Sequence, residues 1–216
     1  MELEDLLLNT LPATYHWKKR VNTLESQTYW EDFQLNDKKA CDNCANQKKE
    51  CEDKVVTNFI IRNTVVITYQ LEDYFKEYAR FYKKAQGNVC DFVHINCSYQ
   101  QFVLNELTCT KKEYVDPYVN SKGRNDGKRE KARQQFNHII SLLTDVEEIT
   151  DFISLFNEKI GLFSWKIPSA SSNDAEKSMG MFMQPQQYVG NISVLSNLNN
   201  DFKFVQQIYP TAFVFI

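Results

Sequence analysis

The sequence predicts a mainly α protein: a small helical bundle around one long amphipathic helix at about residues 55–86, followed by a low-charge, aromatic C-terminal segment of a few short strands. Three observations support this fold class. Apolar residues recur at helical spacing through 55–86. Glycine (6) and proline (5) are scarce, which disfavours the many tight turns of a barrel. Only six of the last 56 residues are charged, whereas nine are aromatic.

The central helix is predicted from a stripe of residues at alternating spacings of four and three. Its members are Ile60, Thr64, Ile67, Leu71, Tyr74, Tyr78, Phe81 and Ala85. Gly87 follows as a natural C-terminal residue, with Lys83 and Lys84 in the last turn facing the negative helix end. The first half, Phe59 to Leu71, is rich in β-branched residues and also suits a strand. The stripe continues without a phase break, which favours one helix.

The other elements follow from shorter signals. Residues 2–9 suggest a short helix, and 15–35 fit neither period. Capping-box pairs predict helices at 98–108 and 145–160, and apolar spacing predicts one at 129–143. Residues 188–195 and 202–216 look extended, and in the second segment phenylalanines alternate at 202/204 and 213/215.

These elements suggest two parts. Residues 1–160 form the helical bundle domain, with a polar, cysteine-containing loop at 36–54 and a basic loop at 110–130. Residues 161–216 form the low-charge aromatic module. This module either packs on the bundle or provides a contact surface for another chain, because aromatic, charge-poor surfaces are typical of interface cores.

Composition restricts the function and the compartment. With 25 basic and 28 acidic residues, the net charge of −3 argues against a protein that coats phosphate backbones. Phosphate-binding glycine loops and the common hydrolase motifs are absent from the sequence. The start, Met1–Leu8, is acidic where a signal peptide is basic, and no apolar run approaches ~18 residues. We therefore expect an intracellular, reducing, cytosol-like compartment without membrane association.

A first candidate site is a zinc site. The spacing Cys41-x2-Cys44-x6-Cys51 provides thiolates that can chelate one tetrahedral Zn²⁺. His94 is the candidate fourth ligand, and it would share a helical face with Cys90 and Cys97. In the alternative interpretation these are ordinary thiols, and His94 is a core residue.

A second candidate site is the pair Arg133 and His138. An arginine can stabilise phosphorane charge while a histidine moves a proton at a 2′-hydroxyl. The Arg133-x4-His138 spacing resembles the signature of HEPN-type ribonucleases, and the resemblance implies a small, often dimeric helical bundle that cleaves RNA. Gln134 departs from the residues common after that arginine. In the alternative interpretation Arg133 is solvated and His138 is partly buried.

A third candidate is the basic stretch that precedes His138. Its cations suit phosphate contacts, and their position at a helix N-terminus opposes the helix dipole. The candidate nucleic-acid-binding residues are Lys122, Arg124, Lys128, Arg129 and Lys131, continued by Arg133. The alternative is a solvated loop and first helical turn.

By elimination, the sequence favours a non-catalytic interaction or adaptor subunit of a larger intracellular assembly, which binds another protein or associates with itself. The absent catalytic motifs, the tyrosine-rich stripe and the low-charge C-terminal segment support this hypothesis. Two alternatives stay open: the HEPN-like ribonuclease of toxin or defence type, and a zinc-stabilised nucleic-acid-binding module.

Overall fold

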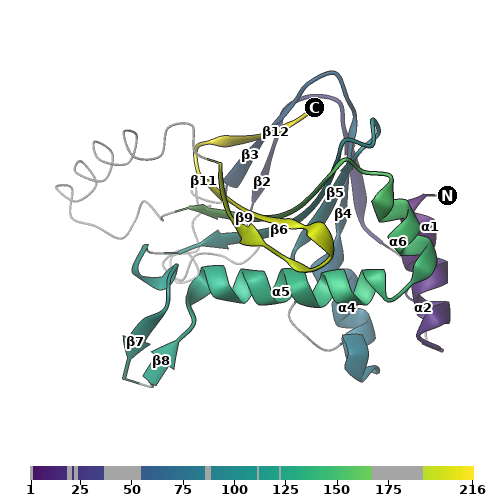
Figure 1. The fold of residues 1–216 in the computed structure, drawn as a ribbon, viewed down its shortest axis with the longest axis horizontal. Helices are drawn as coiled ribbons and strands as arrows, with labels where there is room; N and C mark the ends of the chain where they lie inside the picture. Colours follow the sequence, from purple (N-terminus) through teal and green to yellow (C-terminus); the bar gives the residue numbers. More distant parts are fainter. Residues whose placement is uncertain are drawn as a thin grey trace, which may run out of the picture.

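A computed structural model describes residues 2–18, 21, 24–36, 55–85, 89–110, 112–121, 123–166 and 192–216. It corrects the predicted fold class. The protein is mixed α/β, with twelve strands in three sheets among the described residues, and the predicted mainly α helical bundle is wrong. The sheets, not the helices, organise the chain (Figure 1).

A seven-stranded sheet forms the centre, in the order β1-β4-β5-β6-β9-β11-β10. Strands β1, β4, β5 and β6 run antiparallel to one another, whereas β6, β9 and β11 are parallel neighbours. The strands are β1 (Ser26–Tyr29), β4 (Val66–Gln70), β5 (Phe92–Asn96), β6 (Gln101–Cys109), β9 (Glu158–Lys166), β10 (Ser193–Asn197) and β11 (Lys203–Ile208).

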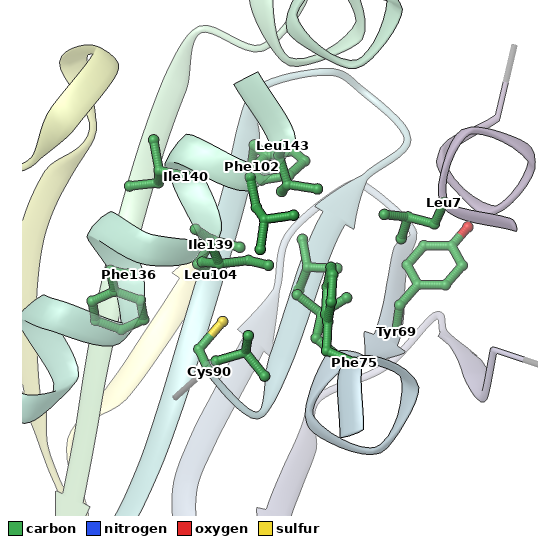
Figure 2. Close-up of a cluster of buried hydrophobic side chains, with 14 of the residues drawn as sticks. Leu7, Tyr69, Phe75, Cys90, Phe102, Leu104, Phe136, Ile139, Ile140 and Leu143 are labelled. Carbon is green, nitrogen blue, oxygen red and sulfur yellow. The ribbon is translucent and has the colours of Figure 1, made fainter. Parts of the chain in front are cut away.

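Helices cover one face of this sheet. Helices α5 and α6 form the crossover between the parallel strands β6 and β9, and Figure 1 shows α5 running across the sheet. The side chains between helices and sheet form a continuous apolar core, part of which Figure 2 shows. The helical elements are α1 (Leu3–Asp5), η1 (Leu6–Thr10), α2 (Leu11–Thr14), α4 (Leu71–Ala79), η3 (Lys83–Ala85), η4 (Lys112–Tyr114), α5 (Gly127–Thr144), α6 (Glu147–Ser154) and η6 (Asn199–Asp201).

A second sheet covers the opposite face. Its order is β12-β3-β2, formed by β12 (Ala212–Phe215), β3 (Val55–Ile61) and β2 (Phe33–Asn36). Aromatic residues of these strands, including Phe33, Phe59 and Phe215, pack on Val103 and Leu162 of the central sheet. The central strands are therefore buried on both faces, between helices on one side and a small sheet on the other. A hairpin of β7 (Tyr118–Asn120) and β8 (Gly123–Asn125) projects from this body (Figure 1).

The predicted long helix at 55–86 is wrong in its first half. Residues 55–70 form β3 and β4 instead, joined by a turn in which Asn63 has a φ of 53°. Helix occupies Leu71–Ala79, the second half of the stripe. The β-branched residues of this segment lie in strands, the structure that they favour. Strand β4 contacts the core on both faces, so apolar and polar residues do not alternate along it. The sequence therefore lacks the period of two that would have predicted a strand.

Two other predicted helices also change. The segment 98–108 is a turn followed by β6, and the helix predicted at 145–160 ends at Ser154 before β9 begins. The helix predicted at 129–143 is confirmed within α5, and the extended segment predicted at 202–216 contains β11 and β12. Strand β10 overlaps the end of the extended segment predicted at 188–195, of which 188–191 lie outside the described residues. Strand β11 pairs with β9, and β12 pairs with β3, so described residues of 161–216 complete both sheets.

Gly161 lies in β9, close to Phe136 of α5 and to Leu198. A Cβ atom at this position would lie 2.6 Å from Leu198 Cδ1 and 2.9 Å from Phe136 Cδ2. We expect Gly161→Ala to lower the free energy of unfolding by about 1–3 kcal/mol, because overpacking displaces neighbouring side chains. Urea denaturation measures this. Leu198→Ala in the same background should recover part of the loss, and a Gly161→Ala protein as stable as wild type would contradict the close approach.

Candidate interaction surfaces

The outer edge of β10 is an exposed apolar strand edge. Within the described residues, no strand pairs with its outer side. Val194 is 62% exposed and Leu195 is 38% exposed. The sequence carries no charged residue between Lys177 and Asp201. Strand edges usually carry charges that prevent further pairing, so this edge is chemically suited to accept another strand.

The inner side of the same strand is firmly held. β10 pairs antiparallel with β11, with a register shift between Val194 and Ser196. Immediately after it, the buried Leu198 donates its backbone N–H to the Phe202 carbonyl at 2.7 Å. The strand is thus fixed on one side and open on the other. The sequence had indicated a low-charge C-terminal segment, but it did not single out this edge, because the order of strands is a tertiary property.

The second candidate surface, here called the basic arm, consists of the described residues of 112–131. It comprises η4, the β7–β8 hairpin and the first turn of α5. Val119, on β7, is 79% exposed, and its cross-strand partner Arg124 is exposed as well. The partly exposed ring of Tyr114 lies against that of Tyr118, with centroids 4.9 Å apart. An aromatic pair therefore lies within a cationic segment.

The base of the basic arm is fixed to the body. Gly127 has a φ of +78°, and a Cβ there would overlap the backbone carbonyl of Asp116. Arg129 forms an ion pair with Asp116, donates from Nε to Gln206 Oε1 at 2.9 Å, and donates its backbone N–H to Val115. Arg129, a predicted nucleic-acid contact, is thus engaged in holding the hairpin to β11.

The other predicted basic residues differ in their surroundings. Arg124, Lys128 and Lys131 are exposed, and Lys122 lies outside the described residues. Lys128 and Lys131 are separated by three positions in α5, so they are neighbours on one helix face. The structure therefore places three predicted contacts on the surface of the arm.

Arg133 and His138 have different surroundings along α5. The Arg133 guanidinium donates to both carboxylate oxygens of Glu130, at 2.8 and 2.7 Å, and this contact lowers the pKa of Glu130. Half-buried His138 has a buried Nε2 without a hydrogen-bond partner, and burial lowers its pKa. Positions five apart point about 140° away from each other around a helix. The structure does not bring the two groups together on one face, and the bundle implied by the ribonuclease resemblance is replaced by a mixed α/β fold.

The predicted zinc ligands are also separated. Cys41, Cys44 and Cys51 lie outside the described residues. His94 is in β5, not in a helix, and it faces the small sheet, whereas the buried Cys90 packs in the core on the helical side. Among the residues that the structure describes, no group of three or more histidine, cysteine or acidic side chains is placed to hold a metal ion.

His94 belongs instead to a buried polar row that crosses five neighbouring strands. Its Nδ1 lies 2.8 Å from Thr68 Oγ1, and its Nε2 lies 3.4 Å from Asn105 Oδ1. The Asn105 amide donates to Ser164 Oγ at 2.9 Å, and Ser164 Oγ donates to Gln207 Oε1 at 3.0 Å. Because the Asn105 amide nitrogen is used as a donor, its oxygen accepts from His94 Nε2–H. Burial of the ring lowers the pKa of His94 and so favours the neutral imidazole.

Two hollows on the described surface are lined by neither predicted catalytic residue. One, of about 660 Å³, lies between the end of α5, α6 and η6, and its charged lining residues are Asp145, Lys159 and Asp201. Another, of about 240 Å³, lies beside α4. Arg133 and His138 line neither of these two hollows.

Comparison with other proteins adds no further assignment: no family model, curated protein or solved structure matches this chain. Within the described residues, no helix combines the length and the apolar composition needed to cross a bilayer.

The buried histidine predicts a pH dependence of stability. Burial lowers the pKa of His94 from 6.5 to about 3. Between pH 3 and pH 6.5 the histidine binds a proton in the unfolded chain but not in the folded chain. The contribution of the buried His94 to the free energy of unfolding is therefore complete above pH 6.5. As the pH falls below 6.5, the free energy of unfolding should decrease by about 1.4 kcal/mol per pH unit.

The test compares urea denaturation at pH 6.5 and pH 5 for wild type, His94→Leu and the exposed-residue control His16→Gln. His94→Leu should be less stable, because Thr68 and Asn105 lose a partner, but its stability should change less with pH. The slope that remains includes His138, whose pKa burial also lowers. Equal slopes in His94→Leu and wild type would contradict the assignment.

Proposed function

We propose that this chain is a non-catalytic interaction subunit of an intracellular assembly, and that it binds an extended segment of another polypeptide along the outer edge of β10. The observation that carries the proposal is the exposed, charge-free edge that β10 forms at one end of the seven-stranded sheet. A partner segment would add an eighth strand. Its main chain would supply affinity through ladder hydrogen bonds, and its side chains would supply specificity.

The chemistry of β10 indicates what kind of segment fits. Val194 and Leu195 present apolar side chains, and the flanking positions are serine and asparagine. A charge-poor segment with β-branched or aromatic residues can pair there without leaving a charge desolvated. A second copy of the folded chain would meet β10 along only five residues, whereas an extended segment can continue over the neighbouring surface.

A lysine in the exposed edge should abolish this interaction. We expect Val194→Lys to reduce partner capture from the native source at least about tenfold, because pairing would desolvate the new charge. Leu155→Lys is the matched control, since it adds the same charge at an apolar residue that is 57% exposed at the end of α6. Proteins lost with Val194→Lys but kept with Leu155→Lys are the candidate partners.

The purified complex then tests the binding mode. Amide hydrogen exchange at 193–197 should slow on complex formation, because strand addition uses the outward-facing backbone groups of β10. Unchanged exchange there would contradict strand addition. A concentration-dependent homodimer of the isolated chain that Val194→Lys dissociates would show that a second copy occupies the edge, and would overturn the proposal of another chain.

A further inference from the structure

The basic arm carries a charge that differs sharply from the rest of the chain. Residues 112–131 contain six basic and four acidic residues, whereas the remaining sequence contains nineteen basic and 24 acidic residues. An acidic protein that concentrates cations on one projecting hairpin and the adjoining helical turn has a local positive field on a negative background. Such fields attract polyanions to one defined place.

The positions of two lysines are unfavourable for the helix that contains them. Lys128 and Lys131 lie in the first turns of α5, where positive charge opposes the helix dipole. They are also like charges three positions apart, which destabilises an isolated helix further. The arginines nearby serve the fold, because Arg129 pairs with Asp116 and Arg133 pairs with Glu130. Among the described residues, Lys128 and Lys131 form no comparable ion pair, and we infer that their unfavourable placement serves a ligand.

Aromatic and apolar groups accompany these cations. The Tyr114 ring is exposed at the base of the hairpin and lies beside Tyr118, and Val119 is exposed nearer the tip. Aromatic rings beside a line of cations are typical of surfaces that bind single-stranded nucleic acid, in which bases stack on rings while phosphates contact lysine and arginine. A duplex hides its base faces and would leave these rings unused.

We propose that the basic arm binds single-stranded nucleic acid, with Arg124, Lys128 and Lys131 contacting phosphates and Tyr114 providing a stacking surface for a base. The rigid base of the arm supports this role. Gly127 and Arg129 hold the hairpin in one orientation, so its cations are presented without the entropic cost of ordering a loose loop. The site is separate from β10, so this proposal and the strand-addition proposal rest on different residues and are tested independently.

The test uses the purified full chain and a fluorescent 20-nucleotide oligo(U), followed by anisotropy over a range of salt concentrations. Three phosphate contacts predict that log K falls with log salt with a slope of about −2. Lys128→Gln with Lys131→Gln should weaken binding about 25-fold at 0.1 M salt and reduce the slope to about −0.7. The control is Lys18→Gln with Lys83→Gln, which removes the same charge from two exposed lysines outside the arm.

A second pair of variants tests the stacking contribution. Tyr114→Ala should weaken oligo(U) binding about tenfold, whereas Tyr114→Phe, which keeps the ring, should bind like wild type. Circular dichroism confirms that each variant is folded. Equal affinity of the arm and control variants would overturn the proposal. So would equal affinity for a duplex of the same length, or displacement by polyglutamate with no effect of Tyr114→Ala, which would indicate a general polyanion surface.

Discussion

Burial of the central sheet on both faces is the constraint on which the rest of the structure depends. Helices cover one face and the β12-β3-β2 sheet covers the other, so strands such as β6 and β9 lie almost entirely out of water. A strand buried in this way must be paired on both edges, since an unpaired buried backbone group costs free energy comparable to a lost hydrogen bond. The long parallel register of β6, β9 and β11 meets this requirement.

The same constraint explains the polar row between the sheets. Buried polar side chains are tolerable only when each has a hydrogen-bond partner, and the row from Thr68 to Gln207 pairs them across five strands. Thr57 donates to Gln207 Oε1 at 2.7 Å and so joins the small sheet to the large one. A one-residue slip of any of these strands would turn its member of the row to the wrong face. The row therefore favours a single register.

A sheet whose central strands are covered on both faces leaves its edges and the projecting hairpin as accessible surfaces for function. The β10 edge is where pairing stops without a charged residue to block it, and the basic arm is where the chain leaves the body as a hairpin. The two surfaces are opposite in character: one is apolar and uncharged, the other cationic. An interaction subunit with both would join a polypeptide partner to a nucleic acid strand, and each contact can be removed by substitution without touching the core.

Helix α5, the extended C-terminal segments and the cationic character of 110–130 could all be predicted from the amino-acid sequence, because each has a local signal in periodicity or charge. The two strands at 55–70 could not be predicted in this way, because apolar residues buried on both faces match either period, and the pairing partners of β3 and β4 lie far away in the chain. Only the tertiary structure decided that His94 fills a buried polar row and that Arg133 and His138 diverge. Spacing along a chain specifies a site only once the element that carries it is known.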